Sequence, residues 1–410
     1  MTENQTPDVD EAPDANLTQP DPTRTGPTRS GFVALIGPTN AGKSTLVNRF
    51  VGAKVSIVSH KVQTTRAVMR GIAIHKNAQI VFMDTPGIFK PRRKLDRAMV
   101  TSAWGGAKDA DLILLLIDSE RGLRGDAEAI LEALKDVPQP KILVLNKIDR
   151  VEREALLKLA TTANETVKFD RTFMISATTG SGCEDIMDYL ADTFPEGPWY
   201  YPEDQISDLP MRQLAAEITR EKLFLRLHQE LPYSSHVETE KWEERKDGSV
   251  RIEQVIYVER DSQKKIVLGK NGEAIKSISS SSRREMSEIL EQTVHLFLFV
   301  KVRENWGNDP ERFREMGLEF PRAGCSAGWR LPQAWGGQAG DTRAGEDDQQ
   351  QARGLQGHDE GHVDRRRGGD DGDGIKPARA CRQIGGERID ALQPPEQEGK
   401  SAAKTHQQHD

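Results

Sequence analysis

Short apolar runs alternate with segments of helical length over the first two hundred residues. The first run is followed by a helical pattern over Lys43–Val51. The runs are Phe32–Ile36, Gln79–Met83, Leu112–Ile117, Ile142–Leu145 and Thr172–Ile175. Strands that are apolar on both faces and separated by helices are typical of a mainly parallel sheet with right-handed crossovers. We therefore predict an α/β domain over residues 29–195, with helices on both faces of the sheet.

A different pattern begins after a Pro- and aromatic-rich stretch, residues 196–206, which we predict to be a linker. The elements expected after it are a helix at Met211–Gln229, strands at Ser235–Glu244 and Val250–Glu259, helices at 274–282 and 283–293, and a strand at His295–Val302. They predict a smaller α+β domain over residues 207–322.

Both ends of the chain lack a hydrophobic pattern. Residues 1–28 contain five prolines in a polar background, and residues 323–410 contain only seven Leu, Ile or Val. Such segments cannot bury enough apolar surface to offset the entropy of folding, so we predict that both are disordered.

Composition limits the class of protein. The net charge of −7 excludes a globally basic nucleic-acid binder, so any nucleic-acid surface must be local. The three cysteines, Cys183, Cys325 and Cys381, are too widely spaced for a zinc motif or a disulfide framework. The polar, acidic N-terminus is unlike a secretory signal, and the most apolar run is too short to span a bilayer. We expect a cytoplasmic protein.

The loop after the first predicted strand carries a phosphate-binding motif. Residues Gly37 to Ser44 match G-x-x-x-x-G-K-[ST] between a strand and a helix, a context that disfavours a chance glycine turn. Lys43 is expected to reach the β- and γ-phosphates, and the Ser44 hydroxyl to bind Mg²⁺. The nucleotide-binding candidates here are Gly37, Pro38, Thr39, Asn40, Ala41, Gly42, Lys43, Ser44 and Thr45.

Three later stretches, each after a predicted strand, point to guanine. Asp84 to Gly87 offers a carboxylate for Mg²⁺ and a glycine amide for the γ-phosphate. The Asp149 carboxylate can accept two hydrogen bonds from guanine N1 and N2, which adenine cannot supply. The remaining candidates of these stretches are Asn146, Lys147, Ser176 and Ala177.

The smaller domain contains a G-x-x-G loop, Gly269 to Gly272, preceded by apolar residues and followed by Ile275 and Ile278 on a predicted helix. Such a loop lets the backbone approach about four nucleotides of single-stranded nucleic acid. Residues 260–284 carry seven basic and two acidic side chains, a local positive patch, whereas a lone G-x-x-G would more often be a turn. The RNA-binding candidates are Gly269, Lys270, Asn271, Gly272, Lys276, Lys264 and Lys265.

Together these motifs resemble the Era family of GTPases over about Arg29–Phe320, including a type II KH domain. The segment from Lys61 to Arg66, called here the switch segment, is similar to the first switch of that family. Thr65 is our choice for the threonine that reaches Mg²⁺, with Thr64 as the alternative. The resemblance implies Mg²⁺ ligands Ser44, Thr65 and Asp84, and catalytic groups Lys43, Thr65, Gly87 and Asn40.

Hydrolysis should be slow, because Ile88 follows Gly87 where Ras-like GTPases have a water-orienting glutamine. Some relatives use K⁺ held partly by a loop asparagine, and Asn40 has that position. The alternative is that Asn40 only stabilises its own turn. A competing hypothesis is that GTP is merely a structural ligand. A third, a membrane-signalling GTPase, is disfavoured because the sequence has no lipidation signal.

The resemblance further implies GTP and GDP as ligands, binding to the 3′ end of small-subunit ribosomal RNA, and a role in 30S subunit maturation. It also implies a monomer with peripheral association with the inner membrane. The chain departs from the family after Pro321. We favour translation beyond a frameshifted stop codon for residues 323–410, and the alternative is a genuine disordered interaction tail.

Overall fold

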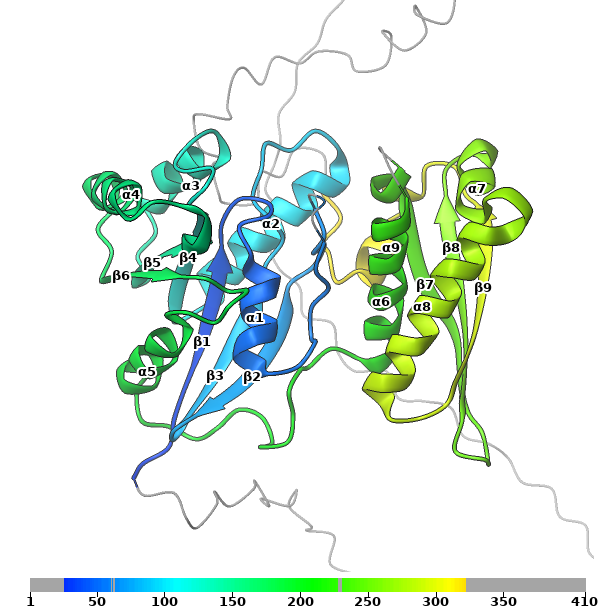
Figure 1. Ribbon diagram of the computed structural model, residues 1–410, viewed down its shortest axis with the longest axis horizontal. Coiled ribbons are helices and arrows are strands. Elements are labelled where there is room, and N and C mark those ends of the chain that lie inside the picture. Colours follow the sequence, from blue (N-terminus) through cyan, green and yellow to red (C-terminus); the bar gives the residue numbers. More distant parts are fainter. Residues whose placement is uncertain (1–25, 60, 62, 228–230, 322–410) are drawn as a thin grey trace, which may run out of the picture. The chain divides into compact units, whose positions relative to one another are not determined.

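The computed structural model describes residues 26–59, 61, 63–227 and 231–321 (Figure 1). The predicted C-terminal extension and nearly all of the predicted N-terminal tail lie outside the described residues. The described part folds into an α/β domain with a six-stranded sheet and a smaller α+β domain with a three-stranded sheet, as the hydrophobic pattern predicts.

The larger sheet has the strand order β2-β3-β1-β4-β5-β6. Every neighbouring pair is parallel except β2 and β3. Its strands are β1 (Arg29–Ile36), β2 (Met69–His75), β3 (Ala78–Asp84), β4 (Leu112–Asp118), β5 (Lys141–Asn146) and β6 (Arg171–Ile175). Five of the six were predicted within two or three residues. The edge strand β2 was missed because Gly71 interrupts its apolar pattern.

Helices cover both faces of this sheet (Figure 1). They are α1 (Lys43–Val51), α2 (Lys94–Asp109), α3 (Asp126–Leu134), α4 (Arg153–Thr166) and α5 (Cys183–Thr193). Successive residues of a strand point to opposite faces. Accordingly Leu35 and Leu114 enter a core with α1 and α5, whereas Ile36 and Leu115 enter a second core with α2, α3 and α4.

The predicted linker is tied to this sheet by hydrogen bonds. The Gln79 side chain accepts from the amides of Tyr200 and Tyr201 and donates to the Tyr201 carbonyl oxygen, over 2.8–3.0 Å. Further along, the Ile72 amide donates to the Ile206 carbonyl oxygen. The linker therefore has a fixed path along the β2–β3 edge.

The smaller domain has the order helix–strand–strand–helix–helix–strand, with β8 antiparallel to β7 and parallel to β9. Its elements are α6 (Met211–Arg226), β7 (Ser235–Glu244), β8 (Val250–Val258), α7 (Asp261–Leu268), α8 (Glu273–Leu290) and β9 (Val294–Val302). Leu223, Phe224, Ile256 and Val267 are among its fully buried side chains. Short 3-10 helices and a last helix complete the described fold: η1 (Ile148–Arg150), η2 (Leu231–Ser234), η3 (Lys270–Gly272), η4 (Trp306–Asn308) and α9 (Pro310–Glu315).

One sequence-based expectation for this domain was wrong, and one helix was not predicted. The two helices expected at 274–282 and 283–293 form one helix, α8. Ile278, Ser282 and Met286 are buried at four-residue intervals across the expected break, so Arg283 and Arg284 simply lie on its exposed face. The apolar residues before the G-x-x-G loop form a helix of their own, α7, which had no assigned structure in the prediction.

The last described segment returns to the larger domain. Trp306, Phe313 and Leu318 share a hydrophobic cluster with Leu95 and Met99 of α2. Ala67, two residues after Thr65, belongs to the same cluster. The end of the smaller domain therefore packs beside the switch segment. Within the part of the chain that the structure describes, no helix is both long enough and apolar enough to cross a membrane.

Candidate nucleotide and nucleic-acid sites

The predicted nucleotide-binding residues converge at one edge of the larger sheet. The carboxyl ends of β1, β3, β4 and β5 lie at this edge because these strands are parallel neighbours. A cleft of about 550 Å³ opens there. Its lining includes Thr39, Asn40, Gly42, Lys43, Ser44, Thr45, Thr65, Gly87, Asn146, Lys147, Asp149 and Ala177. A cavity of that size is typical of a small-ligand site.

The phosphate loop is shaped by glycines. Gly37 and Gly42 both have positive φ. A Cβ on Gly42 would lie 2.2 Å from Nδ2 of the Asn146 side chain. Gly42 is the N-cap of α1 and offers no side-chain acceptor, so the first-turn amides can serve phosphate oxygens. The Lys43 ammonium donates to the carbonyl oxygens of Gly37 and Pro38 at 3.1 and 3.0 Å.

Burial lowers the pKa of Lys43 to about 8, although the nearby Asp84 carboxylate acts in the opposite direction. A buried ammonium that donates to uncharged carbonyl oxygens gains strongly from a phosphate. This lysine is therefore well placed to interact with an anionic ligand.

The three predicted Mg²⁺ ligands lie together. Ser44 Oγ is 2.7 Å from Asp84 Oδ2 and 2.9 Å from Thr65 Oγ1, and Thr65 Oγ1 is 3.3 Å from the same carboxylate oxygen. Thr64 Oγ1 instead donates to the Lys61 carbonyl oxygen. Of the two alternatives, the structure brings Thr65 to the site.

Asp84 is fully buried, and burial raises its pKa even though the Ser56 and Ser44 hydroxyls donate to it. Its Oδ1 atom has no hydrogen-bond partner among the described residues. This buried carboxylate oxygen receives no hydrogen bond, and the hydroxyls of Ser44 and Thr65 lie beside the same carboxylate. Oxygen ligands of this kind suit Mg²⁺. Residues Ser44, Thr65 and Asp84 thus fit the cation that the sequence implies.

Gly87 lies against the phosphate loop, where an added Cβ would be 2.7 Å from Thr39 Cγ2 and 3.1 Å from its amide nitrogen. The next amide, of Ile88, donates to the Gly37 carbonyl oxygen at 3.1 Å. The Ile88 side chain is completely buried in the α2 side of the core. It therefore takes no part in orienting water, in agreement with the sequence-based argument.

The base-recognition loops are joined by Asn146. Its side chain donates to the Ala41 carbonyl oxygen at 2.8 Å and accepts from the Ala177 amide at 2.9 Å. Asp149 is exposed, and a hydrogen bond from Ser176 lowers its pKa. An ionised carboxylate at the mouth of the cleft can accept from two guanine N–H groups.

Asn40 has φ +63, a left-handed conformation that asparagine tolerates in turns, and it also lines the cleft. The geometry is therefore compatible with both roles considered for it.

Asp118 and Ser56 contact predicted residues of the site but were not themselves predicted. Asp118, buried at the end of β4, accepts from the Lys147 ammonium at 2.5 Å, and Ser56 donates to Asp84 at 2.5 Å. The position of Asp118 at the carboxyl end of an apolar run was a usable signal. Ser56 lies in a stretch without a motif, and only the fold brings it to Asp84.

The G-x-x-G loop connects α7 and α8 as a short 3-10 turn. Gly269 and Gly272 have φ +74 and +76, and a Cβ on Gly269 would lie 2.8 Å from the Ala274 amide nitrogen. Lys265, Lys270 and Lys276 are exposed around this turn, whereas Lys264 is half-buried. Exposed Asn271 also has positive φ. The predicted RNA-binding residues therefore surround one tight turn at the N-terminus of α8.

The smaller domain contacts the chain in and around the switch segment. Arg220 of α6 donates to the Thr64 carbonyl oxygen, and Arg66 donates to the Ser235 carbonyl oxygen at 3.0 Å. Glu221, also on α6, accepts from the Val58 amide at 2.8 Å. Contacts from the smaller domain thus hold the chain on both sides of Thr65.

Comparison with known proteins supports both domains. Residues 32–147 match the family of 50S ribosome-binding GTPases, and residues 230–307 match the KH domain. The chain is 90% identical over 296 residues to GTPase Era of Agrobacterium fabrum, covering 72% of this chain and 93% of the relative. It is 86% identical over 296 residues to GTPase Era of Rhizobium meliloti, covering 72% and 95%.

Two solved structures of Era are also similar, each at 37% identity with 71% of this chain and 99% of the other chain covered. One, with a TM-score of 0.68, is Era in complex with MgGDPNP and nucleotides 1506–1542 of 16S ribosomal RNA. The other, with a TM-score of 0.67, is a tyrosine-to-alanine variant of Aquifex aeolicus Era bound to GDP·AlF4⁻.

Proposed function

Because this chain belongs to the GTPase Era family, we propose that it is a GTP-hydrolysing switch that binds the 3′ end of 16S ribosomal RNA and assists maturation of the 30S subunit. The observation that carries the proposal is that one chain joins the cleft lined by Lys43 and Ser44 to a KH domain with a G-x-x-G loop. In the similar Era complex, that protein is bound to MgGDPNP and 16S ribosomal RNA.

In this proposal the predicted nucleotide-binding residues have separate tasks. The phosphate-loop amides and Lys43 hold the β- and γ-phosphates, while Asp149 selects guanine. Ser44, Thr65 and Asp84 would hold Mg²⁺, which would supply positive charge beside the phosphate oxygens. The Gly87 amide contacts the γ-phosphate, so loss of that group releases both Gly87 and Thr65.

Intrinsic hydrolysis is slow in this mechanism because buried Ile88 cannot orient the attacking water. RNA engagement accelerates it, because α6 contacts the chain beside Thr65. A monovalent cation near Asn40 is a further means of acceleration. Replacing K⁺ by Na⁺ at constant ionic strength, in wild type and in Asn40→Ala, would separate this role from turn stabilisation.

The testing experiment measures GTP turnover with and without a single-stranded RNA that copies the 3′ end of 16S ribosomal RNA. Wild type is compared with Lys270→Asp/Asn271→Asp, which changes only exposed residues between the two glycines. Lys246→Asp, at the exposed β7–β8 turn, is the control for added negative charge. RNA should stimulate wild type and the control but not the loop variant. Equal rates in all conditions would refute the coupling.

The family also leads us to propose a cytoplasmic monomer that associates peripherally with the inner membrane. Analytical ultracentrifugation tests the monomer. Co-sedimentation with vesicles of anionic lipids, at low and high salt, tests the membrane association. A protein that stays in the supernatant in both salts would refute the latter without affecting the nucleotide and RNA proposals.

A further inference from the structure

A second cavity lies away from the nucleotide cleft and the G-x-x-G loop. It has a volume of about 290 Å³ and is bounded by the end of the switch segment, α6, β7 and α9. Arg66 and Met69 line it from the larger domain, and His236, Glu238 and Glu315 from the smaller one. The mechanism proposed above assigns no task to these last three side chains.

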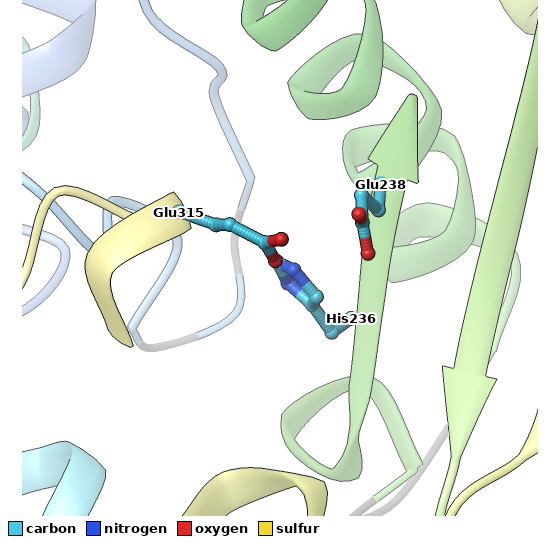
Figure 2. A group of neighbouring side chains, drawn as sticks. All are labelled: His236, Glu238 and Glu315. Atoms are coloured by element: carbon cyan, nitrogen blue, oxygen red, sulfur yellow. The ribbon is translucent and has the colours of Figure 1, made fainter. Parts of the chain in front are cut away.

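His236, Glu238 and Glu315 form a compact group (Figure 2). The first two are two residues apart on β7, so their side chains lie on the same face of the strand. Glu315 is the last residue of α9, and Figure 2 shows its carboxylate extending toward the His236 imidazole. One possible ligand atom from each residue lies within 4.8 Å of the other two.

The histidine is buried with an unused nitrogen. His236 is only 7% exposed, and its ring stacks on Trp306 with centroids 5.5 Å apart. Nδ1 has no hydrogen-bond partner within the described part of the chain. Burial, and then the charges of Arg66, Arg220 and Arg312, keep the pKa of His236 well below its usual range. The neutral imidazole, which is the metal-binding form, is therefore present at physiological pH.

The two carboxylates share one cation. Arg312 Nη1 contacts both Glu238 and Glu315, the latter at 2.7 Å. Burial raises the pKa of Glu238, and the neighbouring Glu315 acts in the same direction against Arg312. Both carboxylates contact the same guanidinium, and an imidazole nitrogen without a hydrogen-bond partner lies nearby. These oxygen and nitrogen atoms could bind a second cation.

We propose that His236, Glu238 and Glu315 form a binding site for a divalent transition-metal ion, with Zn²⁺ as the best fit. One imidazole nitrogen and two carboxylate oxygens suit Zn²⁺, whereas Mg²⁺ and Ca²⁺ prefer oxygen ligands alone. The ligand atoms around tetrahedral Zn²⁺ are about 3.4 Å apart, whereas those of this group lie within 4.8 Å of one another. Metal binding therefore requires the exposed Glu315 side chain to rotate closer to His236 and Glu238. Arg312 is the competitor and releases Glu315 when the metal binds.

The proposed site would connect two parts of the smaller domain. His236 and Glu238 belong to its sheet, whereas α9 carries Phe313 into the cluster with Leu95 and Met99 of α2. Metal binding would hold α9 against the sheet. It would thereby stabilise the hydrophobic cluster that contains Phe313 and Ala67, next to the switch segment. The proposal does not depend on the RNA partner or on hydrolysis.

The test titrates Zn²⁺ into the full-length protein saturated with Mg²⁺ and GDP, so that the nucleotide cleft does not contribute. Binding is followed by calorimetry, and the visible absorption of Co²⁺ reports an ordered coordination site. The variants are Glu315→Gln, Glu238→Gln and His236→Gln. Glu311→Gln, which removes another exposed carboxylate from the same helix, is the matched control.

We expect a saturable site in wild type and Glu311→Gln, weakened at least tenfold in Glu315→Gln and Glu238→Gln. The Co²⁺ spectrum should disappear in His236→Gln. Glu315→Gln changes an exposed side chain, so it remains informative if His236→Gln does not fold. Equal Zn²⁺ binding by wild type and both glutamine variants would overturn the proposal and assign the ion elsewhere, for example to the four histidines beyond residue 322. Absence of saturable binding would overturn it as well.

Discussion

The guanidinium of Arg220 donates a hydrogen bond to the carbonyl oxygen of Thr64. Arg220 is 1% exposed and is held by an ion pair with Glu217 on the same helix. The residue after Thr64 places its hydroxyl beside Ser44 and Asp84. A buried side chain of the smaller domain therefore holds the backbone next to Thr65, the residue that we propose senses the nucleotide state.

Replacing Arg220 by Ala should weaken GTP binding more than GDP binding. In our proposal the ordered position of Thr65 serves the γ-phosphate, which GDP lacks. One lost hydrogen bond of about 0.5–1.5 kcal/mol corresponds to about a 2- to 12-fold change in affinity. Titration with fluorescent GTP and GDP analogues measures the two affinities. Arg212→Ala is the control, because Arg212 lies on the same helix but donates to Thr239 and Glu240 within its own domain. Equal losses for both nucleotides would contradict this role.

Nucleotide affinity should depend on pH through Lys43. Its pKa is lowered to about 8 by burial, and a bound phosphate favours the charged form. Binding therefore takes up a proton above that pH, and the affinity should fall by up to about tenfold per pH unit as the pH rises beyond 8. The folding stability of the nucleotide-free protein should have the opposite pH dependence. Between about pH 8 and 10.5 the unfolded chain binds more protons at this lysine, so stability rises with pH.

Lys43→Arg provides the comparison, since an arginine stays protonated over this range. Between pH 7 and 9 the nucleotide affinity of Lys43→Arg should depend less on pH than that of wild type, although the variant binds more weakly overall. If wild type and Lys43→Arg show parallel pH profiles, another group is responsible.

Asp149→Asn should change base selectivity. In our proposal the ionised carboxylate accepts hydrogen bonds from guanine N1 and N2, whereas an amide presents one acceptor and one donor instead. Loss of charged hydrogen bonds worth about 1.5–3 kcal/mol each predicts a drop of at least about tenfold in GTP affinity. Xanthosine triphosphate, which has an oxygen at the purine C2, should gain affinity. Asp185→Asn, which changes an exposed carboxylate of α5, should leave the affinity for both nucleotides unaffected.

Trp306→Ala should detach the end of the KH domain from α2. The indole is 2% exposed, donates to the Ser234 carbonyl oxygen at 3.0 Å and belongs to the cluster around Met99. Truncating a buried tryptophan costs about 3–5 kcal/mol. We expect a clear decrease in the melting temperature and faster proteolysis of the last described segment. Tyr200→Ala, at a half-exposed ring, should have little effect.

Deleting residues 323–410 should leave nucleotide affinity, RNA affinity and melting temperature unchanged. The relative from Agrobacterium fabrum is 93% covered by 296 residues of this chain, so 114 residues (410 minus 296) have no counterpart in that match. A gene whose resequenced frame ends near Arg322 would support the frameshift. Loss of RNA affinity in the shortened protein would instead support a functional tail.

Much of the nucleotide cleft could be predicted because its residues follow strands within short contiguous motifs. The strand before a motif predicts which edge of the sheet the motif reaches. Lys43 and Asn146 do line the cleft at that edge, and the Asp84 carboxylate contacts Ser44 there. The contacts of Ser56 and Arg220 could not be predicted in this way. Ser56 has no motif around it, and Arg220 lies 156 residues from Thr64 in a helix whose pattern indicates only burial.

The sequence by itself determined the order of domains, the sheet of the first, the G-x-x-G loop of the second and the chemistry of each motif. These features follow from local pattern, since strand periodicity, glycine turns and motif spacing act over a few residues. Tertiary structure decided that Thr65 rather than Thr64 reaches Asp84, that α8 is continuous, and that α9 brings Glu315 to His236. These outcomes depend on packing between segments far apart in the chain, where burial and hydrogen bonding select one arrangement from several that the local pattern allows.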